Sequence, residues 1–323
     1  MNRWIKISLI GLAIAAPLMA LGTARYMVYS LTKPARLSIR ESPDDYDLKF
    51  EDVEFHSTND DLLLRGWYIT TNASDRCIIM VHGGKSHRAD PQIGMLDIAK
   101  QLVNNNFNVL MFDLRGHGES DDGRMTGGQN ERGDVEGAVQ YVKSRGILPQ
   151  NIGLLGFSLG GAASLLAAAE DEQLPAIVAD SCWANLADLI KSQISRRTAL
   201  PTFLGVLVPG IAKRAYGLNI CEVRPIDAVK KIAPRAVFFV HGEVDTVVSV
   251  ENAIRLYHSI HNPNNRLWVV PEAEHVQSFK TQPEQYTRKI IHFFNQYLET
   301  QVTMDSVNYD LCRERVRKDT QSF

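Results

Sequence analysis

The residues best suited to chemistry form one short stretch, a Gly-x-Ser-x-Gly pattern at 156–160 with Ser158 at its centre. An apolar run precedes it at 151–155, and an Ala/Leu-rich stretch follows at 161–169. This order predicts a strand, a tight turn and a helix, the context in which the pattern presents a nucleophilic serine. The glycines permit the turn because side chains at their positions would clash across it. The simpler alternative is a serine that caps an ordinary helix.

A base and an acid that could activate this serine occur later in the chain. A serine hydroxyl is a weak nucleophile at neutral pH, so it needs a base within hydrogen-bond reach and a third group that orients the base. Asp245 follows the apolar run 236–240, and His275 follows the apolar run 266–270. Residues that follow different parallel strands can meet at one edge of a sheet. The order Ser, Asp, His is that of α/β-hydrolases and differs from the chymotrypsin and subtilisin orders.

The elements that would position these residues alternate along the chain. A hairpin is predicted over 51–69, and further strands are predicted at 77–81, 107–112, 151–155, 176–180, 236–240 and 266–270. Helical patterns separate most of these strands, which implies right-handed crossovers and a parallel sheet. One insert, at about 184–220, breaks the alternation. It carries more apolar side chains than a solvated helical pair needs, so we expect a helical lid that walls an acyl pocket or seals against the main domain.

Five motifs together make the chain resemble the α/β-hydrolase superfamily over about residues 50–300. The motifs are His82-Gly83-Gly84, Asp113-Leu114-Arg115-Gly116-His117-Gly118-Glu119-Ser120, Gly156-Phe157-Ser158-Leu159-Gly160, His241-Gly242-Glu243-Val244-Asp245 and Glu274-His275. Within the superfamily, the chain is most similar to the serine aminopeptidase-like branch of esterases, acylglycerol lipases and peptidases. The resemblance implies an α/β-hydrolase fold, with a mostly parallel central sheet, helices on both faces and a helical lid insertion.

The same resemblance implies roles for individual residues. Ser158 would be the nucleophile, His275 the general base and then acid, and Asp245 the group that holds the imidazole in its productive tautomer. The oxyanion hole would consist of the backbone N–H of Leu159 and a second N–H from the loop after the His-Gly dipeptide. We expect Gly84 to supply that second donor, with Lys85 as the alternative. No metal and no organic cofactor would be needed.

Several other polar residues compete for these roles. His117 lies on the loop after an earlier strand, and we expect it to be structural. Asp180 ends a predicted strand, and in some relatives of this fold the acid comes from that position, but the motif around Asp245 is intact. His82 and His241 each precede a glycine at a strand end, which favours a packed role. No residues have metal-ligand spacing.

The first thirty residues differ from the rest. An uncharged apolar stretch at 7–22 follows two basic residues, which predicts a signal anchor or transmembrane helix over 1–30. The alternative is a secreted protein that is cleaved near Ala24. A polar linker at 31–46 would lead to a hydrolase domain at 47–300, and a polar tail would follow at 301–323.

Composition excludes some partners. The formal net charge is −2, and no basic stripe with interleaved aromatic residues occurs, so no nucleic-acid partner is expected. The four cysteines are scattered, which argues against a zinc site or a disulfide framework.

These features predict a membrane-anchored serine hydrolase that cleaves a small-molecule ester or acyl substrate through an acyl-enzyme. A serine aminopeptidase or amidase is the enzymatic alternative. A non-catalytic, membrane-tethered interaction module is the alternative of another class. The sequence alone leaves the oligomeric state and the physiological ester open.

Overall fold

The computed structural model describes residues 3–33, 36–71, 74–197 and 203–299. Within helices, side chains are not described at 3–14, 16, 17, 194–197 and 203–207. The predicted polar tail at 301–323 therefore lies outside the described residues.

An eight-stranded sheet forms the centre of the fold, in the order β1-β2-β4-β3-β5-β6-β7-β8. The strands are β1 (Phe50–His56), β2 (Leu63–Ile69), β3 (Cys77–Val81), β4 (Asn108–Phe112), β5 (Ile152–Phe157), β6 (Ala176–Asp180), β7 (Ala236–Gly242) and β8 (Arg266–Val270). β2 pairs antiparallel with β1 and β4, and the other neighbouring pairs are parallel. β3 to β7 are buried along their whole length, as strands covered on both faces must be.

Helices cover both faces of this sheet. The helices of the main domain are α2 (Met95–Asn104), α3 (Glu131–Ser144), α4 (Leu159–Glu170), α7 (Pro225–Ile232), α8 (Glu251–His258), α9 (Ser278–Thr281) and α10 (Pro283–Tyr297). Successive side chains of a strand point to opposite faces, so Ile78 of β3 packs with α2 and α10 while Ile79 packs with α3 and α4. Short 3₁₀ turns lie at Pro43–Tyr46 and Pro149–Asn151. The α/β-hydrolase architecture predicted from the sequence is therefore confirmed.

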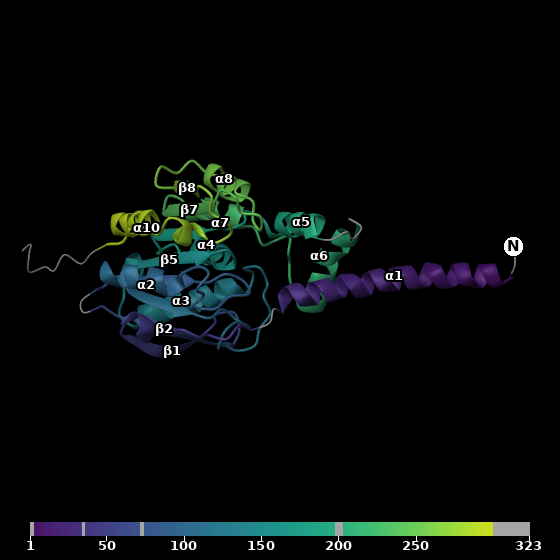
Figure 1. Cartoon of the computed structure of the whole chain (residues 1–323), viewed down its shortest axis with the longest axis horizontal. Coiled ribbons are helices and arrows are strands. Elements are labelled where there is room, and N and C mark those ends of the chain that lie inside the picture. The colour runs from purple at the N-terminus through teal and green to yellow at the C-terminus, as the bar shows by residue number, and fades with distance from the viewer. Residues whose placement is uncertain (1–2, 34–35, 72–73, 198–202, 300–323) are drawn as a thin grey trace, which may run out of the picture.

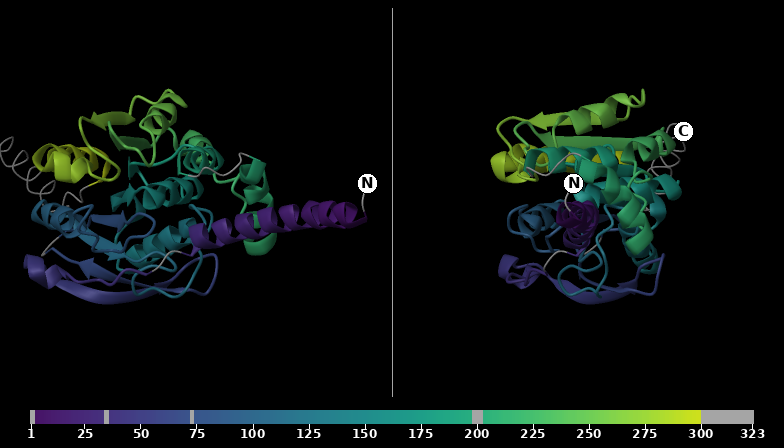
Figure 2. Two further views of the ribbon diagram at one scale, coloured as in Figure 1. Left: turned by 45° about the vertical axis from the view of Figure 1, so that its right-hand side comes forward. Right: turned by 90° about the vertical axis from the view of Figure 1, so that its right-hand side faces the viewer.

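The insert after β6 contains two helices, α5 (Leu186–Arg197) and α6 (Phe203–Tyr216). α6 packs against the N-terminal helix α1 (Arg3–Thr32). Val208 and Ala212 of α6 are buried, as are Ala24 and Val28 of α1. Figures 1 and 2 show the earlier part of α1 extending away from the rest of the chain. That these helices act as a lid stays a prediction.

The predicted membrane anchor falls within α1. Among the residues described, no helix combines the length and the apolar character that crossing a membrane requires. Most side chains of the apolar stretch at 7–22 lie outside the described residues.

Candidate active site

Ser158 lies at the sharp turn between β5 and α4. β5 ends at Phe157 and α4 begins at Leu159, while Ser158 itself has φ 50° and ψ −109°. A positive φ is strained for a residue with a side chain, and such strain gathers at functional sites. A Cβ at Gly160, two residues after Ser158, would collide with backbone carbonyl oxygens at the end of β3, so this position must be glycine. The turn thus holds the serine hydroxyl at the carboxyl edge of the sheet.

The three residues expected to work together meet at this edge. His275 Nε2 lies 2.9 Å from Ser158 Oγ, and His275 Nδ1 lies 2.7 Å from Asp245 Oδ2. These residues follow β5, β7 and β8, which are far apart in sequence. His275 is the most accessible of the three, with 18% of its side chain exposed, whereas the side chain of Asp245 is fully buried. The arrangement can pass the serine proton to an imidazole that a carboxylate orients.

Asp245 accepts more hydrogen bonds than the sequence indicated. Its Oδ1 accepts the backbone N–H groups of Val247 and Val248, each at 2.8 Å. Its Oδ2 lies 3.2 Å from Nε2 of His241 in addition to its bond with His275. Burial disfavours the ionised carboxylate, but the hydrogen bonds from the two histidines outweigh burial and hold the pKa of Asp245 well below its ordinary value.

His241 also contacts the carboxylate of Asp245, and the prediction from sequence did not include this contact. It is fully buried at the end of β7, and its Nε2 lies 2.7 Å from the carbonyl oxygen of Val248. The prediction that it is packed is consistent with this burial. Its position four residues before Asp245, across the same turn, was the available signal that it could also bond the acid.

In the described part of the chain, no hydrogen bond joins Asp180 to His275. Its Oδ1 instead accepts the hydroxyl groups of Ser181 and Ser278. The acid that touches the histidine is Asp245, as the sequence motif favoured.

The loop expected to supply the second oxyanion donor lies beside the serine. A Cβ added to Gly83 would lie 3.5 Å from the Cβ of Ser158, and one added to Gly84 would lie 3.6 Å from the Leu159 side chain. The backbone N–H of Lys85 is already engaged, because it donates to His117 Nε2 at 3.1 Å. This engagement favours Gly84 over Lys85 as the donor.

His117 and His82 join two loops next to the serine. The Nδ1 of His117 donates to the carbonyl oxygen of Arg115 at 2.8 Å, which leaves its Nε2 free to accept from Lys85. His82 Nε2 accepts the N–H of Leu114 at 3.0 Å. Burial lowers the pKa of both histidines, that of His82 to about 3, so both stay neutral near pH 7. Neutral rings are required because each Nε2 must keep its lone pair.

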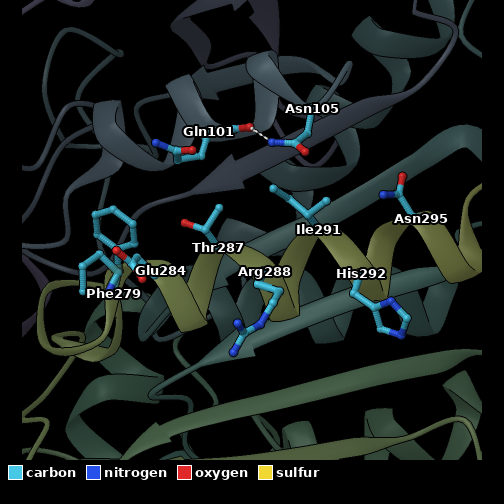
Figure 3. Close-up of a pocket in the computed structure, with 10 residues that line it drawn as sticks. Gln101, Asn105, Phe279, Glu284, Thr287, Arg288, Ile291, His292 and Asn295 are labelled. Atoms are coloured by element: carbon cyan, nitrogen blue, oxygen red, sulfur yellow. Dashed lines mark hydrogen bonds between the residues drawn. The ribbon is translucent and has the colours of Figure 1, made fainter.

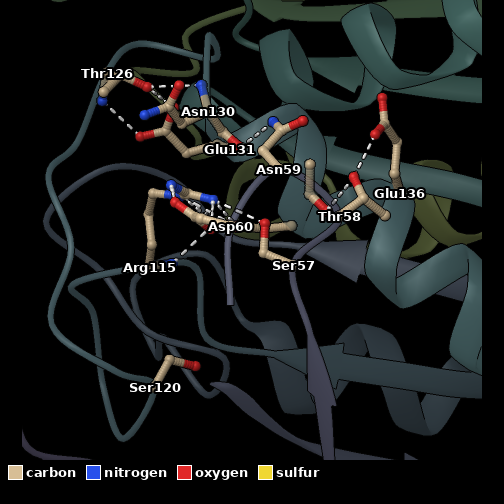
Figure 4. A network of polar contacts seen from close by, with 12 residues as sticks. Ser57, Thr58, Asn59, Asp60, Arg115, Ser120, Thr126, Asn130, Glu131 and Glu136 are labelled. Carbon is tan, nitrogen blue, oxygen red and sulfur yellow. Dashed lines mark hydrogen bonds and ion pairs between the residues drawn. The ribbon is translucent and has the colours of Figure 1, made fainter. Parts of the chain in front are cut away.

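A buried ion-pair network fixes the loop that carries His117. The Arg115 side chain is 2% exposed, and it bonds the carboxylate of Asp60 and the hydroxyl of Ser57 (Figure 4). It also bonds the carboxylate of Asp134. Asp134 also accepts the backbone N–H of Arg115 at 3.0 Å. Because the guanidinium is planar and rigid, these bonds fix both the side chain and the backbone of the loop.

Two grooves on the described part of the chain lie away from Ser158. One, of about 620 Å³, lies between α2 and α10, where Gln101 faces Thr287 and Ile291 (Figure 3). The other, of about 430 Å³, includes Lys143 and Glu170 of α3 and α4. Neither is lined by a residue of the site. Within the described chain, no cluster of three His, Cys, Asp or Glu side chains is placed to hold a metal ion.

Comparison with known proteins identifies relatives of this chain. The model of the prolyl oligopeptidase family matches residues 96–301. The uncharacterised protein YfhR of Escherichia coli K12 is 27% identical over 264 residues, which cover 78% of this chain and 82% of that protein.

Solved structures give the same fold. The Pyrococcus furiosus esterase Pf2001 superposes with a TM-score of 0.68 at 27% identity, over 82% of this chain and all of the esterase. Est1E of Butyrivibrio proteoclasticus, solved with ferulic acid bound, superposes with a TM-score of 0.61 at 20% identity, over 76% of this chain and 99% of that protein. This likeness shows the fold alone.

Proposed function

The chain belongs to the prolyl oligopeptidase family and is an α/β-hydrolase of the serine hydrolase class, and on this premise we propose that it cleaves carboxylic esters through an acyl-enzyme on Ser158. The observation that carries the proposal is the continuous chain of contacts from Ser158 Oγ through His275 to Asp245.

The proposed reaction follows from these contacts. His275 Nε2 takes the hydroxyl proton as Ser158 Oγ attacks the ester carbonyl carbon, and the N–H groups of Leu159 and Gly84 stabilise the negative oxygen. The tetrahedral intermediate collapses when His275 returns the proton to the leaving alcohol. A water molecule, deprotonated by the same histidine, then attacks the acyl-enzyme and releases the carboxylic acid and the free serine. Asp245 stabilises the imidazolium that forms in each step.

Ester cleavage is favoured over peptide cleavage by the structural likeness to the esterase Pf2001, at 27% identity over the whole of that enzyme. An aminopeptidase would need a free carboxylate to bind the substrate amine. The exposed carboxylate of Glu243, two residues before Asp245, could take that role, but it already accepts the backbone N–H of Glu272 at 3.3 Å. Peptide cleavage stays the second candidate because the matching family is named for peptidases.

We also propose that the N-terminal segment anchors the enzyme in a membrane and is retained. The uncharged stretch at 7–22 supports anchoring, as do the exposed apolar side chains of Leu18, Met19 and Leu21. Retention is supported by Ala24 and Val28, which are buried where α1 packs on α6. Cleavage near Ala24 would remove part of this packing. In this proposal α5 and α6 form a lid whose position α1 helps to fix.

The test uses the full-length protein in detergent micelles. Wild type should hydrolyse p-nitrophenyl butyrate and react with a fluorophosphonate probe, whereas Ser158→Ala and His275→Ala should do neither. Ser144→Ala is the matched control, because Ser144 is exposed at the end of α3. Aminoacyl p-nitroanilides test the peptidase alternative in parallel. Folded wild type that neither turns over an ester nor labels would refute the proposal.

Anchoring is tested separately by membrane fractionation. Full-length protein should stay in the membrane pellet after an alkaline carbonate wash, and a variant that lacks residues 1–22 should not. The deletion ends before Ala24 so that the packing on α6 is kept. Full-length protein recovered in the supernatant would contradict the anchor.

A further inference from the structure

A buried group of hydroxyl side chains lies behind the loop that carries His275. The group centres on Asp180, the last residue of β6, and includes Ser181 and Ser278. All three side chains are buried, with at most 1% exposed. Nothing in the proposed reaction uses them, so their arrangement needs another explanation.

Two hydrogen-bonded paths lead from Asp180 to the residues that follow His275. On the first path, the Ser181 hydroxyl donates to Asp180 Oδ1 at 3.0 Å and accepts the backbone N–H of Val276, also at 3.0 Å. On the second path, the Ser278 hydroxyl donates to the same oxygen at 3.1 Å. Asp180 therefore holds the chain at Val276 and Ser278, which lie one and three residues after His275.

The held segment has a backbone conformation that the chain would not adopt by itself. Val276 has φ 54°, which is a marked outlier for a β-branched residue. Such a conformation persists only where surrounding contacts impose it. The hydroxyl of Ser181 supplies one such contact at the Val276 N–H. Loss of that contact would let the segment relax and would shift the preceding imidazole.

The same strand end also touches the nucleophile. The backbone carbonyl oxygen of Asp180 accepts the N–H of Ser158 at 2.8 Å. One residue thus contacts the serine through its main chain and the histidine loop through its side chain. Both attachments adjoin the two residues whose side chains meet, Ser158 and His275.

What the two serines need from Asp180 is an acceptor oxygen, not a negative charge. Both hydroxyl groups donate to one oxygen, Oδ1, and an asparagine can present the same oxygen. Burial raises the pKa of Asp180 to about 6, although the hydrogen bonds from the two serines act in the opposite direction. This behaviour is opposite to that of Asp245, whose pKa is held low.

We propose that Asp180 and Ser181 are positioning residues that hold the loop after β8 so that His275 lies within hydrogen-bond reach of Ser158. The inference rests on the proposed function, since it takes His275 to be the base. It gives the two buried acids of the site different roles, because Asp245 orients the imidazole ring and Asp180 orients the backbone that carries it.

The test compares kcat, KM and melting temperature in full-length variants with p-nitrophenyl butyrate as substrate. Ser181→Ala should lower kcat by about 10²-fold, the cost of misplacing a reacting group by about 1 Å. KM should stay within about two-fold, because substrate contacts are unchanged. Asp180→Asn should keep most of the wild-type kcat, since the amide oxygen can accept both hydroxyls. Ser164→Ala is the matched control, because that buried hydroxyl has no hydrogen-bond partner among the described residues.

Two results would overturn the inference. Ser181→Ala with wild-type kcat and only a lower melting temperature would show a role in stability alone. Asp180→Asn as inactive as Asp245→Asn would show that the charge of Asp180 is needed. If wild type is active, either result refutes the positioning role of Asp180 and Ser181 but does not contradict the proposed ester hydrolysis. Folded wild type that neither hydrolyses nor labels refutes the proposed function, and the positioning inference with it.

Discussion

Replacing Asp245 by asparagine tests the catalytic assignment at a single atom. The asparagine Oδ1 can still accept the N–H groups of Val247 and Val248, so the turn after β7 keeps its support. The position of Oδ2, however, becomes an NH₂ group that faces His275 Nδ1 at 2.7 Å and His241 Nε2 at 3.2 Å. An oxygen that accepts hydrogen bonds from two histidines is thus replaced by an NH₂ group of similar size that can only donate.

The expected loss follows from the tautomer of His275. A donor at Nδ1 requires the ring to carry its proton on Nε2, and that ring cannot accept the Ser158 proton. In serine hydrolases with this arrangement, the same exchange lowers kcat by about 10⁴-fold, which corresponds to about 5 kcal/mol of barrier. The mismatched bonds should cost about 1–3 kcal/mol of folding stability. Activity should therefore fall much further than stability.

The assay measures kcat for p-nitrophenyl butyrate and the urea dependence of unfolding in the same preparations. Asp188→Asn is the matched control, because the Asp188 carboxylate pairs with Arg255 at the exposed surface. Retention of more than about one-tenth of wild-type kcat by folded Asp245→Asn would refute the tautomer argument.

Three further predictions concern the framework of the site. Gly160→Ala should destabilise the fold by about 1–3 kcal/mol in urea unfolding, because the added Cβ would meet rigid carbonyl oxygens. Gly210→Ala is the control and should not destabilise the fold, because Gly210 has open space around it. Equal stability of the two variants would contradict this prediction. Arg115→Met should cost about 3–5 kcal/mol, since it leaves the Asp134 carboxylate buried without its partner, and a loss below about 1 kcal/mol would refute a structural role. For His82, the pKa is about 3 in the folded state and about 6.5 in the unfolded state, so the unfolded chain binds the proton first as pH falls. The free energy of unfolding should therefore decrease as pH drops from about 6.5 to about 3. His82→Gln should make the free energy of unfolding less dependent on pH, and equal pH dependence in variant and wild type would contradict this.

Much of the local structure could be predicted because short-range patterns determine it. The apolar runs became strands, and the Gly-x-Ser-x-Gly pattern became the expected turn, since glycine is required where a Cβ would meet backbone atoms. The fold class and the serine hydrolase class followed from the order of those motifs and are confirmed. The domain boundaries, the anchor and the lid stay predictions.

The finer contacts of the site depend on residues that the sequence separates. Ser158 and His275 are 117 positions apart, and only the parallel register of β5 to β8 brings their side chains together. The sequence predicted Gly84 as the second oxyanion donor and left Lys85 as the alternative. The structure shows the backbone N–H of Lys85 bonded to His117, which is 32 positions away. Motifs could therefore name the side chains that we propose react, because their chemistry is local to each residue. Their hydrogen-bond partners could be assigned only by the packed structure, because a hydrogen bond depends on distances that the folding of the whole sheet sets.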